Sequence, residues 1–511
     1  MARRSPLVAL DVRRDADRVT ELLDGYDDVR RDGPDLTVHR ALLDTFDWRI
    51  RRAGGALSWC DGTLTWRDRA TGHTHTVAQE ELPRWPDDVV AGPVHDLVAD
   101  ACDVRVLLPR VEVDLTVQRY RLLDDLDKTV VRIDLERGCV ADGTPVASLV
   151  VRGVRGYDGE HAGLVRRLAE DLDGQTADGE PADIVFAAAG LEPGGYTGEL
   201  AVSLEPTMAA NEAIARTCRH LLQTMRANED GVIADLDTEF LHDFRVAVRR
   251  TRSLLGASKR VLPGPVRDDF RRRFKWLGDV TTPVRDLDVF SLAIPEYADA
   301  AARGDLEVLQ PLADLVAADQ QQAHAALTTA LRSQDYADLV SDWSETLEAS
   351  PTDEETTEAT DPIVEVARQR IWRAYRGVQR DGRAIDDDSP SEMLHRLRKD
   401  AKKLRYLLEA FGALFDADRT KVAVRELKRL QDNLGAFQDG EVQSQELCGF
   451  VTRIARHPAN ADTVMALGVL ASHLEQVQDD ARAQFAKRFA RFDRSGNRAL
   501  YEGLFSPKAV R

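Results

Sequence analysis

The second half of this chain contains an internal repeat that aligns without a gap. Residues 239–289 match residues 392–442 at an offset of 153 positions, and 14 of the 51 aligned pairs are identical. Unrelated sequences of average composition would share roughly three such pairs. Whatever fold this region adopts must therefore contain two copies of one structural unit.

Hydrophobic periodicity predicts that this unit is helical. Apolar residues recur at i, i+3, i+4 and i+7 in ten segments: 208–228, 238–262, 266–280, 286–302, 305–333, 362–383, 390–415, 419–434, 438–456 and 461–492. Proline and glycine fall between many of them. We expect an all-α domain over residues 201–511, with helices in antiparallel pairs. It would comprise repeat one at 207–348, an acidic linker at 349–362 and repeat two at 363–511.

The first 200 residues follow a period of two, which is typical of strands. Residues 111–123, 129–136 and 147–155 alternate and are rich in valine, isoleucine, threonine and tyrosine. Residues 56–68 predict a hairpin that turns at Asp61 and Gly62. Helices are expected at 15–24 and 160–172, and a Gly/Pro-containing connector at 173–206. The fold class is therefore α+β, with an N-terminal antiparallel β-barrel followed by the duplicated helical domain.

The positions that agree between the two copies place cations on one helix face. Because a helix advances about 100° per residue, positions 242, 245, 249 and 252 share an arc of about 80° beside an apolar arc. Positions 272 and 275 share a face of the next helix, and both stripes recur in the second copy. The candidate binding residues are His242, Arg245, Arg249, Arg250, Arg252, Arg272, Lys275, His395, Arg398, Lys402, Lys403, Arg405, Arg425 and Lys428.

Net charge must be resolved by position to be informative. The chain has 69 Lys and Arg against 88 Asp and Glu, a formal charge of −19, which argues against a general nucleic-acid or membrane coat. Residues 239–289 hold 12 cations against 7 acids and residues 392–442 hold 11 against 9, so these segments sum to +7 and the rest to −26. A single basic stripe is usually a solvated face. Matched stripes on two helices in both copies favour a groove for a compact polyanion.

The side-chain types indicate phosphate rather than bases or metal. Arginine offers bidentate donors to phosphate oxygens, and lysine offers a point charge. Aromatic residues near the stripes are limited to Trp276 and Tyr406, and neither has an aromatic counterpart in the other copy, whereas single-stranded nucleic acid normally needs stacking platforms. There is no phosphate-binding Gly-rich loop and no closed metal motif, and the five cysteines are scattered. The two histidines could equally be structural, or orient an arginine.

The repeated segments resemble a known family. EFLHDFRVAVRRTRSLL and EMLHRLRKDAKKLRYLLE, each followed by a basic helix, are similar to the two halves of a CHAD domain, a histidine-containing α-helical domain that binds inorganic polyphosphate. The resemblance implies a pair of four-helix bundles with pseudo-twofold symmetry and phosphate contacts from the stripes. The family's Arg-Asp-x-Asp-Val segment stands here as residues 285–289. In the second copy it has become Gln-Asp-Gly-Glu-Val, at residues 438–442, whose acids would instead orient neighbouring cations.

Residues 1–200 resemble a degenerate CYTH domain, the triphosphate-tunnel fold. The stretch 42–57 and the strands at 111–155 are similarly placed. However, the first strand should read Glu-x-Glu-x-Lys, and residues 9–13 read Ala-Leu-Asp-Val-Arg. Two acidic pairs, Asp134 with Glu136 and Glu112 with Asp114, are equally explained by solvent-facing alternation. Without the first-strand carboxylates a Mg²⁺ or Mn²⁺ site is lost, so we expect a tunnel-like barrel with little or no hydrolytic activity.

Together these patterns predict a non-catalytic protein that binds inorganic polyphosphate electrostatically and needs no cofactor. One alternative is a CYTH-type, metal-dependent triphosphatase with divergent ligands. Another is a scaffold whose groove meets RNA phosphates. No segment approaches about 18 uninterrupted apolar residues, so no membrane span is expected. We expect a cytoplasmic protein, with association with polyphosphate granules as one option, and the sequence leaves its oligomeric state open.

Overall fold

The computed structural model describes residues 7–14, 16–172, 180–302, 304–349, 356–457 and 460–507. The chain divides into two compact units, Met1–Gly198 and Glu199–Arg511. Residues 350–355 of the acidic linker expected at 349–362, and residues 173–179 of the connector expected at 173–206, lie outside the described residues.

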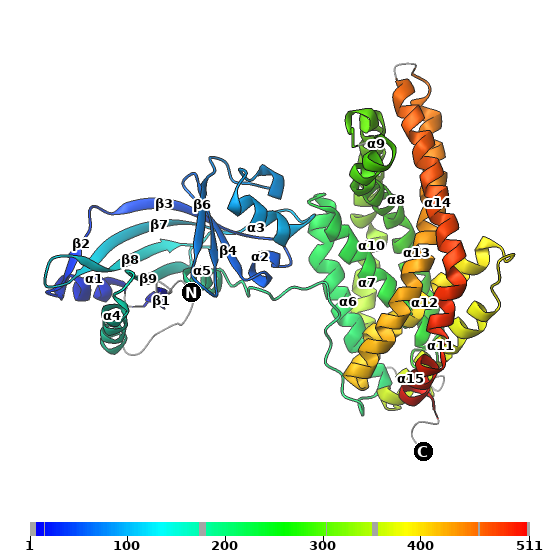
Figure 1. The fold of residues 1–511 in the computed structure, drawn as a ribbon. Helices are drawn as coiled ribbons and strands as arrows, with labels where there is room; N and C mark the ends of the chain where they lie inside the picture. Colours follow the sequence, from blue (N-terminus) through cyan, green and yellow to red (C-terminus); the bar gives the residue numbers. More distant parts are fainter. Residues whose placement is uncertain are drawn as a thin grey trace. The chain divides into compact units, whose positions relative to one another are not determined.

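The N-terminal unit is built on one antiparallel sheet that curls into a half-barrel (Figure 1). Its strand order is β1-β9-β8-β7-β3-β4-β5-β6, with β2 paired to β7, so the curl stays open between β1 and β6. The expected hairpin is confirmed, since Asp61 and Gly62 both have positive φ, at 43° and 83°. The strands are β1 Leu7–Asp11, β2 Val29–Arg31, β3 Leu36–Asp44, β4 Gly55–Cys60, β5 Thr63–Asp68, β6 Thr74–Ala78, β7 Leu108–Leu123, β8 Thr129–Cys139 and β9 Pro145–Gly153.

Helices cover this sheet where its side chains are apolar. The expected helices α1 (Ala16–Gly25) and α4 (Asp158–Asp171) pack on a core formed by β1, β7, β8 and β9. The helices α2 (Arg49–Arg52), α3 (Pro93–Cys102) and α5 (Pro181–Ala188) were not expected. Val185 and Phe186 of α5 pack against alternate valines of β7, and α5 also lines the pocket discussed below.

The C-terminal unit is entirely helical, and its helices begin at the spacing of the repeat. The pairs α6 and α11, α7 and α12, and α8 and α13 each start 153 residues apart, at 210 and 363, 238 and 391, and 264 and 417. The helices are α6 Ala210–Ile233, α7 Thr238–Ala257, α8 Gly264–Ala302, α9 Gln310–Leu331, α10 Gln334–Glu348, α11 Ile363–Arg383, α12 Ser391–Phe411, α13 Ala417–Ile454, α14 Ala461–Phe492 and α15 Ser495–Phe505. The duplication is therefore one of structure as well as sequence.

Several expected helix boundaries were wrong. Segments 266–280 and 286–302 form the single helix α8, which continues through Pro283, and segments 419–434 and 438–456 form α13. Packing overrides the local helix-breaking tendency of proline, since Val284 and Phe290 just beyond it are buried. The segment expected at 305–333 is a short 3₁₀ turn followed by α9, and both α10 and α15 were missed.

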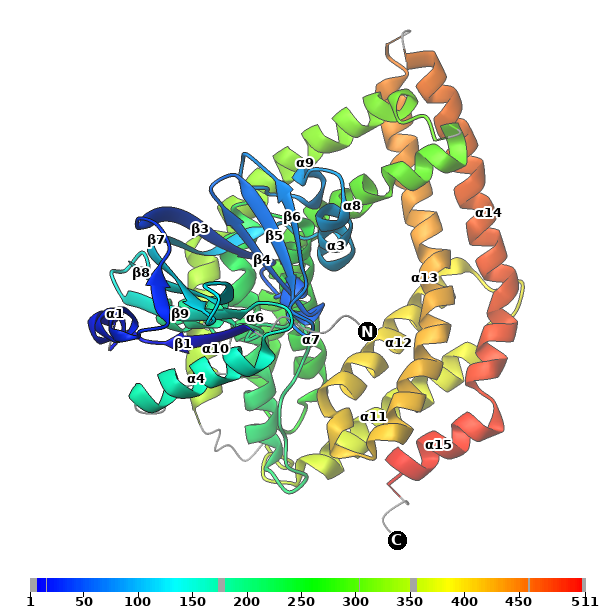
Figure 2. The same ribbon diagram turned by 60° about the vertical axis from the view of Figure 1, so that its left-hand side comes forward.

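The repeats contact each other at several places within the helical unit. Ala209 and Pro362, which are 153 residues apart, pair with each other in an antiparallel bridge, as equivalent residues do beside a twofold axis. Farther along, the second half of α8 shares an apolar core with α13 and α14, which includes Phe290 and Phe450 (Figure 1). The helix α12 packs against both α11 and α13 (Figure 2). No described helix is both long and apolar enough to cross a bilayer.

One close helix contact provides a test of this packing. A Cβ atom on Gly382 of α11 would lie 2.0 Å from the ring of Phe489 on α14, whereas a Cβ on Gly377 of α11 would meet nothing within 4 Å. We expect Gly382→Ala to lower the free energy of unfolding by about 2 kcal/mol because overpacking forces helices apart. Gly377→Ala should raise it by about 0.5 kcal/mol through helix propensity. Urea unfolding followed by circular dichroism measures both, and equal effects would contradict this packing.

Candidate functional site

The helical unit contains a cationic cavity of about 730 Å³ between α7, α8 and α12. We call it the cationic section. Eight of its lining side chains are cationic and one is a carboxylate. Its lining consists of Arg249, Arg252, Ser253, Gly256, Asp268, Arg271, Arg272, Lys275, Lys399, Lys402, Lys403 and Tyr406.

A second cavity of about 680 Å³ lies against the same helices and α13. We call it the mixed section, because three carboxylates stand among its cations. Its lining consists of His242, Arg245, Arg249, Arg285, Asp286, Val289, Phe290, Arg398, Lys399, Lys402, Gln438, Asp439, Val442, Gln443 and Glu446.

The two sections adjoin, because they share Arg249, Lys399 and Lys402, and we call them together the groove. Equivalent residues of the two repeats line it together. Arg249 and Lys402, at the same repeat position, line both sections, while Arg245 and Arg398 line the mixed section. The groove therefore follows the pseudo-twofold relation between the repeats. Stripes that are separate in sequence become the two walls of one site.

The cations of the groove are held close enough to affect one another. Burial, together with Arg398 and Arg249, lowers the pKa of Lys402 to about 8. Burial and Arg249 lower the pKa of Arg245 to about 10. Arg245 is oriented by α8, because its Nη1 donates hydrogen bonds to the hydroxyls of Thr281 at 2.7 Å and Thr282 at 3.0 Å. These cations stay crowded without enough carboxylates to neutralise them.

Carboxylates partly neutralise the positive charge of the mixed section. The Nη2 of Arg398 lies 2.9 Å from Asp439 Oδ1. Burial raises the pKa of Asp286 and of Glu446 and lowers that of Arg285, so desolvation acts on both signs of charge here. The part of the groove best suited to a polyanion is therefore the cationic section and its junction with the mixed section.

Nine of the fourteen residues predicted from sequence line the groove. They are His242, Arg245, Arg249, Arg252, Arg272, Lys275, Arg398, Lys402 and Lys403. The structure places the other five elsewhere. Arg250 and Arg405 both bond to Glu409, at 2.9 and 2.6 Å, and His395 Nε2 lies 2.6 Å from Glu441. Arg425 and Lys428 are exposed on α13 and line neither section.

Four of the groove residues that were not predicted as site residues are cationic or aromatic side chains that the repeat does not match. Lys399, Arg271, Arg285 and Tyr406 correspond to valine, valine, glutamine and serine in the other copy. At these positions the two copies differ in residue type, so the repeat does not single them out. Lys399 could still have been found, since it lies four residues after His395 and three before Lys402 on the same helix face.

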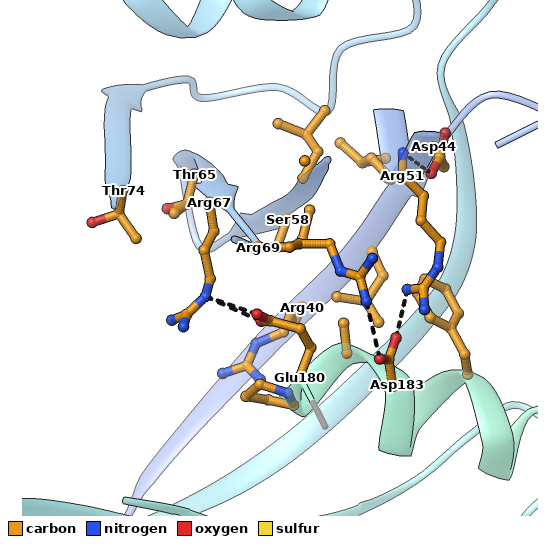
Figure 3. Close-up of a pocket in the computed structure, with 18 of the residues that line it drawn as sticks. Arg40, Asp44, Arg51, Ser58, Thr65, Arg67, Arg69, Thr74, Glu180 and Asp183 are labelled. Carbon is orange, nitrogen blue, oxygen red and sulfur yellow. Dashed lines mark hydrogen bonds and ion pairs between the residues drawn. The ribbon is translucent and has the colours of Figure 1, made fainter. Parts of the chain in front are cut away.

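The N-terminal unit has its own pocket of about 350 Å³, lined by strands of the curled sheet and by α5 (Figure 3). Five of its lining residues are arginines, and four of these are ion-paired within the pocket. Arg40 bonds to Glu136 at 2.8 Å. Glu180, immediately before α5, pairs with Arg67 at 3.0 Å, and Asp183 of α5 pairs with Arg51 at 2.6 Å and Arg69 at 3.4 Å.

These contacts decide whether the divalent cation of a triphosphate tunnel fits here. Buried Ala9 and Leu10 occupy the first strand, while Asp11 is paired with Arg13 at 2.6 Å. Of the two acidic pairs noted in the sequence, only Glu136 lines the pocket. Both terminal nitrogens of Arg40 donate hydrogen bonds to its carboxylate. Among the described residues, no cluster of three or more His, Cys, Asp or Glu side chains could hold a metal. The donor set does not fit a divalent cation.

The crowding around Lys402 predicts a pH-dependent stability. Its pKa is about 8 in the native state against an ordinary value of 10.5, so between these values the unfolded chain binds the additional proton. The amount by which Lys402 lowers the free energy of unfolding is therefore greatest below pH 8, and it falls to zero as the pH rises to 10.5. We expect Lys402→Met to raise the free energy of unfolding at pH 7 by about 1 kcal/mol, a value discounted for partial solvation.

The gain from Lys402→Met should shrink toward pH 10, as measured by urea unfolding at each pH. Its control is Lys403→Met, because the adjacent lysine is exposed. That variant should change stability by less than about 0.5 kcal/mol at every pH. A loss of stability in Lys402→Met at pH 7 would refute the crowding argument.

Comparisons with known proteins agree with this architecture. Residues 216–448 match the family described as the CHAD domain. The uncharacterized protein Rv2226 of Mycobacterium tuberculosis strain H37Rv is 28% identical over 303 residues, which cover 58% of this chain and 55% of that protein. The chain thus spans about half the length of the curated relatives it matches.

Two solved structures are also similar. The CHAD domain from the plant Ricinus communis has 25% identity and a TM-score of 0.45, covering 61% of this chain and 98% of that one. PptA from Streptomyces chartreusis has 17% identity and a TM-score of 0.40, covering 55% and 99%. The N-terminal half-barrel is consistent with a CYTH-like domain. Residues 216–448, with their duplicated helices and shared groove, are a CHAD domain.

Proposed function

We propose that the groove of the CHAD domain binds inorganic polyphosphate. The observation that carries the proposal is the cationic section, where eight cationic side chains and one carboxylate line a single cavity. A chain of phosphates offers oxygen acceptors along its whole length, so it can satisfy guanidinium and ammonium donors from both walls at once. The two repeats, 207–348 and 363–511, would each contribute one wall.

The charge distribution supports a compact linear ligand. Three cations of the cationic section, Arg271, Arg272 and Lys275, are paired with acids of α8. The other five make no ion pair with any described residue, and each bound phosphate would relieve their mutual repulsion. The remaining surface is strongly acidic and would repel a broad polyanion such as duplex nucleic acid. On this proposal the protein associates with polyphosphate granules in the cytoplasm.

The junction of the two sections provides the most direct test. Arg249→Ala with Lys402→Ala removes the pair that lines both, and we expect affinity for long-chain polyphosphate to fall at least about tenfold. Fluorescence anisotropy of labelled polyphosphate at constant salt measures this. Arg425→Ala with Lys428→Ala is the matched control, because it removes the same charge from exposed positions outside the groove. Equal losses in both double variants would mean that only overall charge matters.

The salt dependence provides an independent measure of contacts. If the eight cations of the cationic section all meet phosphate, the slope of log affinity against log salt should be about −6, by analogy with single strands. Arg249→Ala with Lys402→Ala should make the slope shallower by about 1. A slope near zero would be incompatible with a groove that works by releasing counterions.

The alternatives have distinct outcomes. A metal-dependent triphosphatase would release phosphate from tripolyphosphate when Mg²⁺ or Mn²⁺ is added, and it would first have to free the pocket arginines from Glu180 and Asp183. An RNA-binding scaffold would release bound polyphosphate to RNA at equal phosphate concentration. Neither outcome is expected from a groove selective for a linear phosphate chain.

A further inference from the structure

An aromatic side chain ends the cationic face of α12. Tyr406 lies three, four and seven residues after Lys403, Lys402 and Lys399, so it continues their helix face. Its ring is half-buried and lines the cationic section. It makes no hydrogen bond or ring contact with any residue that the structure describes. The groove therefore presents an unpartnered aromatic face directly beside its cations.

The facing helix leaves room next to that ring. The repeat equivalent of Tyr406 is Ser253 on α7, which lines the same section together with Gly256. A Cβ atom on Gly256 would meet nothing within 4 Å, so the space there is open. One wall thus supplies a flat ring, while the other supplies two of the smallest side chains. A planar group can stack on the face of this ring, whereas a phosphate chain can use only its hydroxyl.

A single carboxylate completes this section. Asp268 lines it while bonding to Arg267 at 2.9 Å and lying 3.6 Å from Arg271. A carboxylate repels phosphate, but it accepts hydrogen bonds from hydroxyl and amino groups. Cations, one aromatic ring and one acceptor together match a molecule that has phosphates at one end and a nucleoside at the other.

We propose that the cationic section binds a nucleoside 5′-polyphosphate, with its phosphates on Arg249, Lys399 and Lys402 and its base against Tyr406. This inference rests on the proposed function, because the phosphate chain uses the same cations. A single aromatic ring can stack with one base. A single-stranded RNA would need successive stacking platforms, and in the described residues Tyr406 is the aromatic side chain that lines this section.

Calorimetric titration of the full chain with two ligands of equal phosphate number tests the proposal. Adenosine 5′-tetraphosphate carries one ionisable oxygen fewer than inorganic tetraphosphate, so charge alone favours the inorganic ligand. We expect the nucleotide to bind about tenfold more tightly, as stacking of one base allows. Tyr406→Ser, which installs the residue of the other repeat, should abolish this preference, so that the two ligands bind with affinities that differ by less than about twofold. Tyr406→Phe should retain the preference.

A matched aromatic control lies outside the groove. Trp276 on α8 lines neither section, so Trp276→Leu should leave both affinities unchanged. Equal affinity of the wild type for the two ligands would overturn the nucleotide proposal while leaving polyphosphate binding intact. A preference that survives Tyr406→Ser would overturn it as well. If the wild type bound neither ligand, the proposed function would fail together with this inference.

Discussion

Mutual repulsion between like charges is the constraint that the helical unit must overcome. Arg249 of the first repeat and Lys402 of the second line the same cavity, and the repulsion between their charges contributes to the lowered pKa of Lys402. Apolar contact holds them there. On the same two helices, the arc beside each cationic stripe is fully buried, with Leu241 and Phe244 on α7 and Leu394 and Leu397 on α12. Burial of such side chains contributes about 2 kcal/mol each, enough to offset partly solvated repulsion.

The two repeats use the same helices but do not contribute equally to the groove. Glu409 of α12 stands where α7 has Gly256, and it bonds to both Arg250 and Arg405. One substitution between the copies thus keeps two arginines away from the groove. Gly278 on α8 has the opposite effect, because a Cβ there would lie 2.8 Å from the guanidinium of Arg252, a residue that lines the cationic section. Local carboxylates and glycines decide which members of a repeated stripe line the groove.

In the N-terminal unit, carboxylates neutralise most of the arginines that line the pocket. Glu180, which precedes α5, and Asp183 of α5 pair with three arginines of its pocket, and Glu136 pairs with a fourth. A polyanion would have to displace these carboxylates. In the groove of the helical unit, the α8 cations Arg271, Arg272 and Lys275 are also paired with acids of their own helix. Arg249, Lys399 and Lys402 make no ion pair with any described residue. The difference lies in the partners rather than in the number of arginines, because both sites are arginine-rich.

The sequence alone determined the duplication, the change from strands to helices, and the stripes of His242, Arg245, Arg249 and their counterparts, because periodicity and repeat offset are local properties. It could not place α5, whose acids meet arginines more than a hundred residues away in the chain, nor show that Glu409 draws Arg250 from the groove. It also divided α8 at Pro283, where tertiary packing sustains a continuous helix. Only the tertiary structure decided that two stripes become opposite walls of one groove, since that requires the repeats to face each other. For the same reason Lys399 and Tyr406, unmatched in the repeat, emerged as groove residues only once the helices were in place.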